Sequence, residues 1–98
     1  MANKFTLSEE ALSDLRRVGR YTQKEYGVKQ RKKYLAQLDK RFVQLSKSPH
    51  LGRERPEIKL GYGSVVEGKH VIFYRVKDIN IEILRVLHGN MDIKRQIE

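Results

Sequence analysis

Apolar residues recur every three or four positions through the first half of the chain, the spacing of an amphipathic helix. Ser8 is suited to the N-cap of such a helix, and Gly27 is suited to its C-terminal end. Glu9 and Glu10 would then lie in the first turn, where the helix dipole favours carboxylates. The inward stripe of this helix is expected to be Ala11, Leu15, Val18, Thr22 and Tyr26.

A second helix is expected over Val28–Lys47, because apolar residues continue at the same spacing. Its apolar seam is Leu35, Leu38, Phe42 and Leu45. Pro49 ends this helix, since the residue before a proline is pushed out of the α region. The connection at Gly27 is so short that the two helices must form an antiparallel hairpin.

The second half of the chain changes to the pattern of β-strands. His70–Lys77 and Ile81–His88 are rich in Val, Ile, Phe and Tyr and are separated by a polar break, which predicts a hairpin. Tyr62–Val66 precedes them as a third strand of a meander. Lys4–Leu7 reads as another short strand, whereas His50–Gly61 is expected to be irregular.

The order strand, helix, helix, strand, strand, strand indicates an α+β fold, with the helical hairpin packed on a small antiparallel sheet. At 98 residues the chain is expected to be a single domain, 1–98. Asp92–Gln96 predicts one more helical turn near the end.

Both faces of the predicted strand hairpin are apolar. If Lys77 pairs with Asn80, Arg75 lies opposite Glu82. One face then holds Val71, Phe73, Arg75, Glu82, Leu84, Val86 and His88. The other holds His70, Ile72, Tyr74, Val76, Ile81, Ile83, Arg85 and Leu87. Because the helices can cover only one face, we expect another protein chain to cover the second.

Charge adds a second property to this picture. The chain holds 21 Lys/Arg and 12 Asp/Glu, a formal net charge of +9, and most of the excess lies in residues 1–48. Such a surface attracts nucleic acid or an acidic protein, so a plain nucleic-acid-binding module is one alternative. There is no cysteine, which excludes disulfides. Without a membrane span or an apolar signal segment, a cytoplasmic protein is expected.

Four segments together resemble the ParE branch of the RelE/ParE toxin superfamily. They are LSEEALSDLRRVGRYTQKEYG (7–27), SPHLGRERPE (48–57), HVIFYRV (70–76) and EILRVLHGNMD (82–92). The resemblance implies a toxin of a bacterial toxin–antitoxin module with the fold described above. It also implies a ParD-like antitoxin, whose disordered tail wraps the toxin.

The superfamily divides by target: ParE-like members bind DNA gyrase and trap its cleaved-DNA state, and RelE-like members cut mRNA on the ribosome. RNA cleavage needs a general base, a general acid and cations. Candidate groups are Arg53, Arg55, Lys59, Arg75 and Arg85 as cations, with His88 and Glu57 for proton transfer. Nuclease members tend to carry Arg near the position of His70, and Tyr or a basic residue where this chain has Gly89. Gyrase inhibition is therefore expected, with mRNA cleavage as the alternative.

The resemblance and the surface pattern give two expected contact sets, and contact with DNA is expected only through gyrase. The expected gyrase-binding residues are Arg53, Arg55, Arg85, His88, Met91 and Arg95. The expected antitoxin-binding residues are Leu15, Val18, Leu38, Phe42, Ile72, Tyr74, Ile81 and Ile83.

No catalytic residue and no cofactor are expected. No metal is expected either, because the three histidines are not at ligand spacing. His50 is expected on the surface, and His70 and His88 in structural roles. Tyr21, Tyr26 and Tyr34 suit packing between the helices, with base stacking as the alternative.

Overall fold

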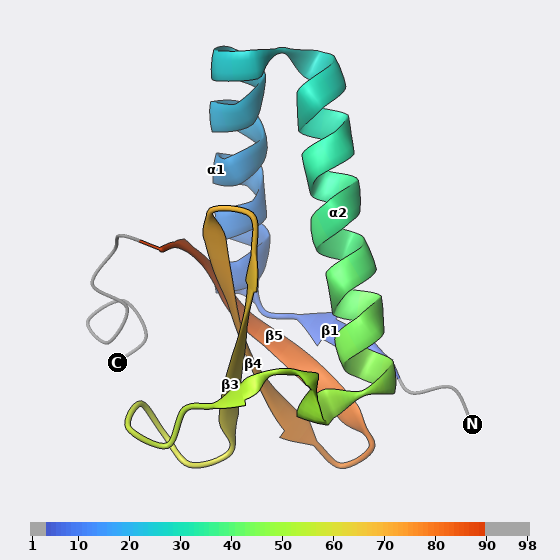
Figure 1. The fold of residues 1–98 in the computed structure, drawn as a ribbon, viewed down its shortest axis with the longest axis vertical. Coiled ribbons are helices and arrows are strands. Elements are labelled where there is room, and N and C mark those ends of the chain that lie inside the picture. The colour runs from blue at the N-terminus through green and yellow to red at the C-terminus, as the bar shows by residue number, and fades with distance from the viewer. Residues whose placement is uncertain (1–3, 90–98) are drawn as a thin grey trace.

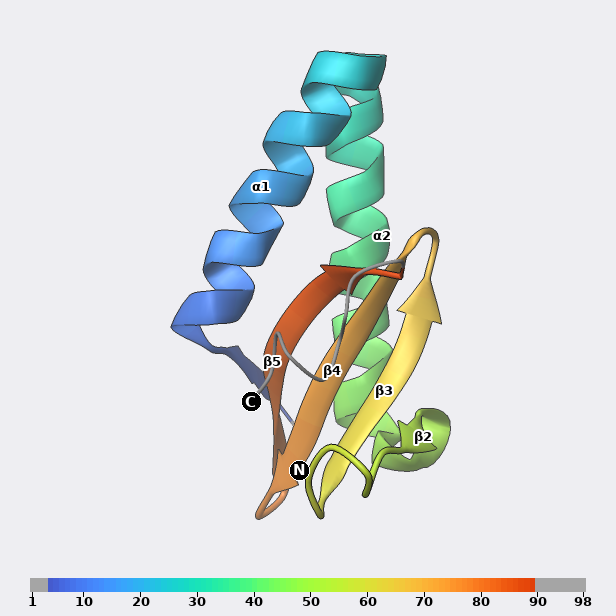
Figure 2. The same ribbon diagram turned by 90° about the vertical axis from the view of Figure 1, so that its left-hand side faces the viewer.

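Two long helices cover one face of a five-stranded sheet in the computed structural model, which describes residues 4–89 (Figures 1 and 2). The elements are β1 (Phe5–Leu7), α1 (Glu9–Tyr26), α2 (Val28–Lys47), the 3-10 turn η1 (Pro49–Leu51), β2 (Arg53–Glu54), β3 (Tyr62–Glu67), β4 (His70–Lys77) and β5 (Asn80–His88). In both views the joined ends of the helices project beyond the sheet. The turn predicted at Asp92–Gln96 lies outside the described residues.

The helix boundaries confirm the predicted caps. The Ser8 hydroxyl oxygen accepts the N–H of Ala11 at 3.0 Å, and the same hydroxyl donates to the carbonyl of Leu84 at 2.8 Å. The N-cap therefore also ties the start of α1 to β5. Gly27, at φ 95°, is the single residue between the helices. A side chain there would be strained at this positive φ, which explains the glycine.

The sheet has the strand order β1-β5-β4-β3-β2 and contains the predicted meander β3-β4-β5. Two features differ from the expectation of an all-antiparallel sheet. β1 pairs parallel with β5, so the sheet is mixed. β2, inside the segment expected to be irregular, pairs with β3. A strand of two residues is too short to show an alternating pattern, which is why the sequence did not predict it.

The register of the β4–β5 hairpin follows the prediction only near its turn. Lys77 lies opposite Asn80 and Arg75 opposite Glu82, but the register shifts between Tyr74 and Phe73, so that Arg85 is the residue opposite Phe73. Leu84 is the extra residue of this β-bulge. Every residue after it changes face, so the predicted faces were wrong from residue 85 onward.

The core lies between the helices and the sheet. It consists of Ala11, Val18, Leu38, Phe42, Leu45, Ile72, Tyr74, Ile81, Ile83 and Val86. Phe5 extends it, with its ring centroid 5.5 Å from that of Phe42. On the opposite sheet face, Phe73 and Leu87 are also buried. Phe73 and Leu87 are therefore not exposed apolar surface, whereas Val66 on the same face is 62% exposed, and the covering of this face by another chain stays a prediction.

Candidate functional site

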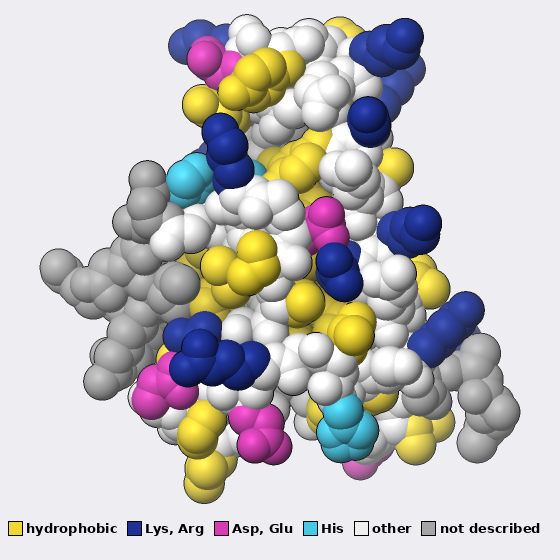
Figure 3. Space-filling model, in the orientation of Figure 1, with side chains coloured by type: hydrophobic (Ala, Val, Ile, Leu, Met, Phe, Trp, Pro, Cys, Tyr) yellow, Lys and Arg dark blue, Asp and Glu magenta, His cyan; other side chains and the backbone are white. Residues whose placement is uncertain are grey.

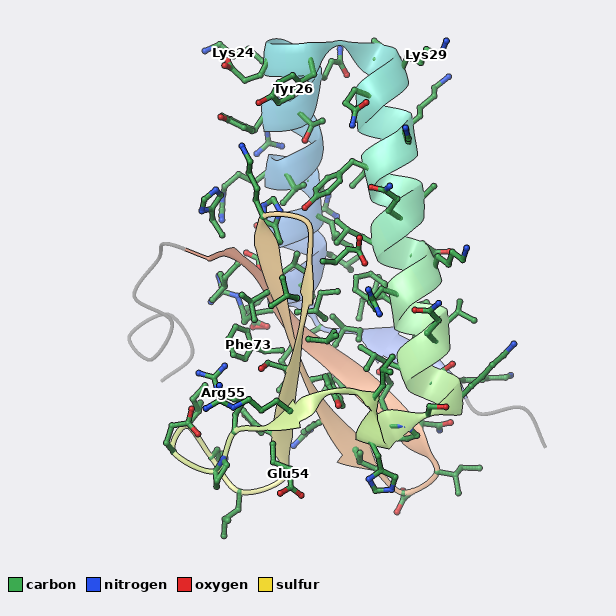
Figure 4. The ribbon with its side chains drawn as sticks, in the orientation of Figure 1. Lys24, Tyr26, Lys29, Glu54, Arg55 and Phe73 are labelled. Carbon is green, nitrogen blue, oxygen red and sulfur yellow. The ribbon has the colours of Figure 1, made fainter. Side chains whose placement is uncertain are left out.

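Arg55 holds the loop between β2 and β3 against the second sheet face. Its Nε donates to Glu57 at 2.6 Å, and one terminal nitrogen donates to the Ser64 hydroxyl at 3.0 Å. Its guanidinium carbon lies 5.5 Å from the centre of the Phe73 ring, a cation–π contact (Figure 4). The hydrogen bond from Arg55 also lowers the pKa of Glu57. The guanidinium of Arg55 is thus bound within the fold, whereas the side chain of nearby Arg53 is exposed.

Arg85 forms a buried ion pair with Asp14 that joins β5 to α1. Its Nε and a terminal nitrogen donate to the two carboxylate oxygens of Asp14 at 2.8 and 3.0 Å. The Val86 backbone N–H donates to the same carboxylate at 2.9 Å. This hydrogen bonding raises the pKa of Arg85, and Asp14 is only 1% exposed. Arg85 therefore has a structural role in the fold, and its contact with gyrase stays a prediction.

The sequence did not single out Asp14 as a functional or structural residue. One signal was present: Asp14 lies between Ala11 and Val18 on the inward stripe of α1, where a carboxylate requires a buried partner. Its partner is 71 positions away along the chain, so spacing alone could not identify it.

A second cluster lies where α2 meets the start of β4. The Tyr34 hydroxyl donates to the Glu67 carbonyl at 3.1 Å and lies 2.6 Å from Nδ1 of His70. Since a phenol carries one proton, the His70 Nδ1–H is then the donor to Tyr34. His70 pairs with His88 across the strands, and their ring centroids are 5.5 Å apart. Burial, and then the neighbouring His88, lower the pKa of His70, so His70 is neutral near pH 7.

A cavity of about 470 Å³ opens beside this cluster. It is lined by Tyr21, Thr22, Tyr26, Gln30, Tyr34, Gly68, Lys69, His70 and His88. Tyr21 and Tyr26 are 59% and 62% exposed, so the prediction that they pack between the helices was wrong for both. Tyr34 is half-buried, and its hydrogen bonds and ring contact are with Glu67 and His70 of the sheet. In Figure 3 apolar side chains show between the two helices, with histidine and basic side chains near them.

Among the expected gyrase-binding residues within residues 4–89, Arg53, Arg55 and Arg85 lie in one row across the sheet around Phe73, and His88 lies apart from them. Arg53 lies opposite Ser64 on β3, and Ser64 lies opposite Phe73 on β4. His88 lies opposite His70, which precedes Phe73 by three residues on β4. At about 3.3 Å per residue, that separates the two ends of the set by roughly 10 Å along the sheet. Met91 and Arg95 lie outside the described residues.

Within residues 4–89 no group of three or more His, Cys, Asp or Glu side chains is placed to hold a metal ion. Neither helix of that part of the chain is long and apolar enough to cross a membrane.

The sequence model of the ParE toxin of type II toxin–antitoxin system parDE matches residues 5–93. The chain belongs to the ParE toxin family. Toxin ParE1 of Mycobacterium tuberculosis is 34% identical over 98 residues, which cover 99% of this chain and 100% of that protein. Toxin ParE1 of Caulobacter vibrioides is 31% identical over 93 residues, which cover 95% and 96%. The expected family is thus confirmed.

Solved structures of related toxins show the same fold. The chromosomal ParDE system from P. aeruginosa matches with a TM-score of 0.75 at 19% identity, over 89% of this chain and 96% of that chain. The toxin–antitoxin complex RelBE2 from Mycobacterium tuberculosis matches with a TM-score of 0.65 at 22% identity, over 90% and 99%. Two helices on a mixed five-stranded sheet are therefore the fold that this ParE chain shares with these toxins.

The residues expected to bind an antitoxin form the interior of this ParE fold. Val18, Leu38, Phe42, Ile72, Tyr74, Ile81 and Ile83 are buried, and Leu15 packs half-buried against them. Most of them are enclosed between the helices and the sheet, although Val18 and Tyr74 each also line a surface cavity. The prediction that they form an exposed surface was wrong, because the apolar pattern that marks a binding seam also marks a core.

Proposed function

We propose that this ParE toxin binds DNA gyrase and stabilises its DNA-cleavage complex, and that it acts by binding rather than by cleaving RNA. A ParD-like antitoxin neutralises it. Membership of the ParE family supports the target. The observation that carries the mechanism is that the arginines best suited to RNA cleavage are already bound to carboxylates within the fold.

Three of the five candidate cations for RNA cleavage are held in ion pairs. Arg55 is bound to Glu57, Arg75 to Glu82 at 2.8 Å, and Arg85 to Asp14. The side chains of Arg55 and Arg85 are less exposed than that of Arg75. A phosphate could use these guanidinium groups only by displacing a carboxylate from a hydrogen-bonded pair. Cations that stabilise a phosphorane must instead be directed at the substrate before it arrives.

The two candidate proton-transfer groups are also badly placed for one reaction. Glu57 is hydrogen-bonded to Arg55 in the loop that precedes β3. His88 lies beside the turn that follows β3, where it pairs with His70. General acid–base catalysis needs both groups within hydrogen-bond reach of the reacting oxygens. This separation favours a binding mechanism over nuclease chemistry.

The test compares gyrase and ribosome directly. Purified toxin should abolish supercoiling by gyrase and should leave linear DNA when the reaction is stopped with detergent and protease. Ribosome-bound mRNA should stay intact. Arg53→Ala should weaken inhibition, since Arg53 is exposed on β2, and Lys59→Ala on the neighbouring loop is the matched charge control. Normal supercoiling together with cut mRNA would contradict the proposal.

The antitoxin surface also needs a new location, and the exposed apolar side chains near β2 supply one. Leu60 is 84% exposed and Val76 half exposed. Both line a cavity of about 430 Å³ together with Pro56, Tyr62 and Tyr74. Large apolar side chains that face water around a hollow are typical of a protein contact. We therefore place the antitoxin contact here instead of at the core residues.

An antitoxin peptide should raise the melting temperature of the toxin, because it binds the folded state only. At a peptide concentration of 100 Kd the stabilisation is about 2.7 kcal/mol. Leu60→Ser should reduce the shift, whereas Val43→Ser, an exposed apolar position on α2, should leave it unchanged. An unchanged shift with Leu60→Ser would place the contact elsewhere.

A further inference from the structure

The tyrosine-lined cavity of about 470 Å³ adjoins a smaller one of about 200 Å³. The two share Tyr21, His70 and His88, so they form one continuous depression. The smaller part adds Arg17, whose side chain is 61% exposed. We call the whole depression the tyrosine cleft. Its volume lies in the range of pockets that bind small organic groups, about 300–1,000 Å³.

Tyrosine side chains line the tyrosine cleft, and two of these side chains are unusually exposed. Tyr21 and Tyr26 are more than half exposed, although neither lies in a loop, and Figure 4 shows Tyr26 at the upper end of α1. Their rings contribute little to the core of this fold. Exposed rings around a hollow are suited to stacking on a flat partner, and every nucleobase offers such a face.

His70 forms a neutral part of the floor of the cleft and is held by its neighbours. His70 is fixed from one side by the hydrogen bond to Tyr34 and from the other by the edge of the His88 ring. The lowered pKa of His70 keeps this ring neutral near pH 7. A neutral imidazole presents an aromatic face and a ring nitrogen, which suit a base better than a phosphate.

Cations lie at the edge of the cleft rather than on its floor. Arg17 lines the smaller part and Lys69 the larger part. Asp14 is the acidic residue that lines the cleft; its carboxylate is bound to Arg85 by short hydrogen bonds and to Arg17 by a longer one of 3.4 Å, and the Arg17 side chain remains 61% exposed. The cleft therefore carries net positive charge beside its aromatic walls. This combination matches a planar base attached to a negatively charged backbone.

We propose that the tyrosine cleft binds one unpaired nucleotide of a DNA single strand, with the base against Tyr21 and Tyr26 and the backbone beside Arg17 and Lys69. The choice of DNA rests on the proposed action on gyrase, whose cleavage complex contains opened DNA. The cleft itself requires only an unpaired base. A paired base in a duplex cannot enter, because its faces are stacked and its edge is covered.

The test measures binding of fluorescently labelled hexathymidylate to the purified toxin by anisotropy. Tyr21→Ala and Tyr26→Ala should each weaken binding by about tenfold, the effect of losing one base–aromatic stack. Tyr62→Ala, at the cavity near β2, is the matched control and should bind like the unmodified chain. Tyr21→Phe keeps the ring and should also bind normally. Unchanged melting temperatures for the exposed Tyr21 and Tyr26 variants would show that the fold is intact.

A second comparison separates the cleft from general charge attraction. Arg17→Ala should weaken binding more than Arg16→Ala, because Arg17 lines the cleft and its neighbour does not. Hexathymidylate should bind more tightly than a duplex of the same length. Equal losses for the two arginine variants, or equal affinity for duplex and single strand, would overturn the proposal. Thymidine monophosphate binding as tightly as the hexamer would overturn the strand as the ligand.

Two further results distinguish this inference from the proposed function. Gyrase inhibition without any binding of single strands would overturn the cleft proposal and leave the target intact. Cleft-dependent binding of single strands without gyrase inhibition would support the cleft and overturn the target. A hexauridylate that binds more tightly than hexathymidylate would overturn the choice of DNA.

Discussion

Replacing Asp14 with alanine removes the carboxylate at the centre of the contact between α1 and β5. In the folded chain that carboxylate receives two hydrogen bonds from Arg85 and one from the Val86 backbone, and a longer one of 3.4 Å from Arg17. Alanine leaves the Arg85 guanidinium, which is 17% exposed, without this partner. It also leaves the Val86 N–H without its acceptor in a buried part of β5.

The size of the effect follows from these contacts. Removing one partner of a buried ion pair destabilises a protein by about 3–5 kcal/mol. Since Arg85 retains some contact with solvent, we expect the lower end of that range, about 3 kcal/mol. A domain of this size has a free energy of unfolding of about 5–15 kcal/mol, so the loss is a large fraction of the total. The melting temperature should fall by about 12–24 °C.

Urea unfolding followed by circular dichroism measures this loss. Asp14→Asn keeps an acceptor for Val86 but loses the charge, so it should be destabilised by about half as much, because charge-assisted hydrogen bonds are about twice as strong as neutral ones. Glu82→Ala breaks the more exposed pair with Arg75 and should change stability by about 1 kcal/mol or less. A loss below about 1 kcal/mol for Asp14→Ala would refute the reasoning.

The remaining predictions concern close packing and the Tyr34–His70 contact. Gly52→Ala should destabilise the chain by about 1–3 kcal/mol in urea unfolding, since a Cβ there would lie 2.3 Å from the Tyr74 hydroxyl oxygen; no loss would contradict the tight contact. Tyr34→Phe should lower stability by about 0.5–1.5 kcal/mol through its lost hydrogen bonds to His70 and the Glu67 carbonyl. The pKa of His70 is lowered from 6.5 in the folded chain, so the unfolded chain takes up the proton first as the pH falls. The contribution of His70 to the free energy of unfolding should therefore be complete above pH 6.5 and should decrease below it. His70→Gln should flatten this part of the pH profile of the melting temperature.

The helices and the strand meander could be predicted because their information is local. The cap at Ser8, the glycine at position 27 and the proline at position 49 each mark a boundary through their own backbone preferences. The pairing of Arg75 with Glu82 followed from the short turn, because the length of a hairpin turn determines the register of its strands. These features need no knowledge of residues distant in the chain.

The β-bulge shows where local information ended. Nothing in the run Ile83-Leu84-Arg85 marks Leu84 as the extra residue, since apolar and β-branched residues continue on both sides. The bulge places Val86 in the core and His88 opposite His70. The pairing of His70 with His88 thus depends on one irregularity, whereas the pair of Arg85 with Asp14 joins residues 71 positions apart.

The residues of the predicted contact sets show a second limit of local information. An apolar stripe and a conspicuous arginine are each consistent with a surface or an interior role, and only the partner across the fold decides. Asp14 makes Arg85 structural, and Glu57 with Phe73 does the same for Arg55. Conversely, Tyr21 and Tyr26 occur at helical spacing typical of a core and nevertheless face solvent. In this ParE toxin, contacts with gyrase, antitoxin and DNA should be tested first at the residues that stay exposed after such pairing. Prominence of a residue type in the sequence is a weaker guide.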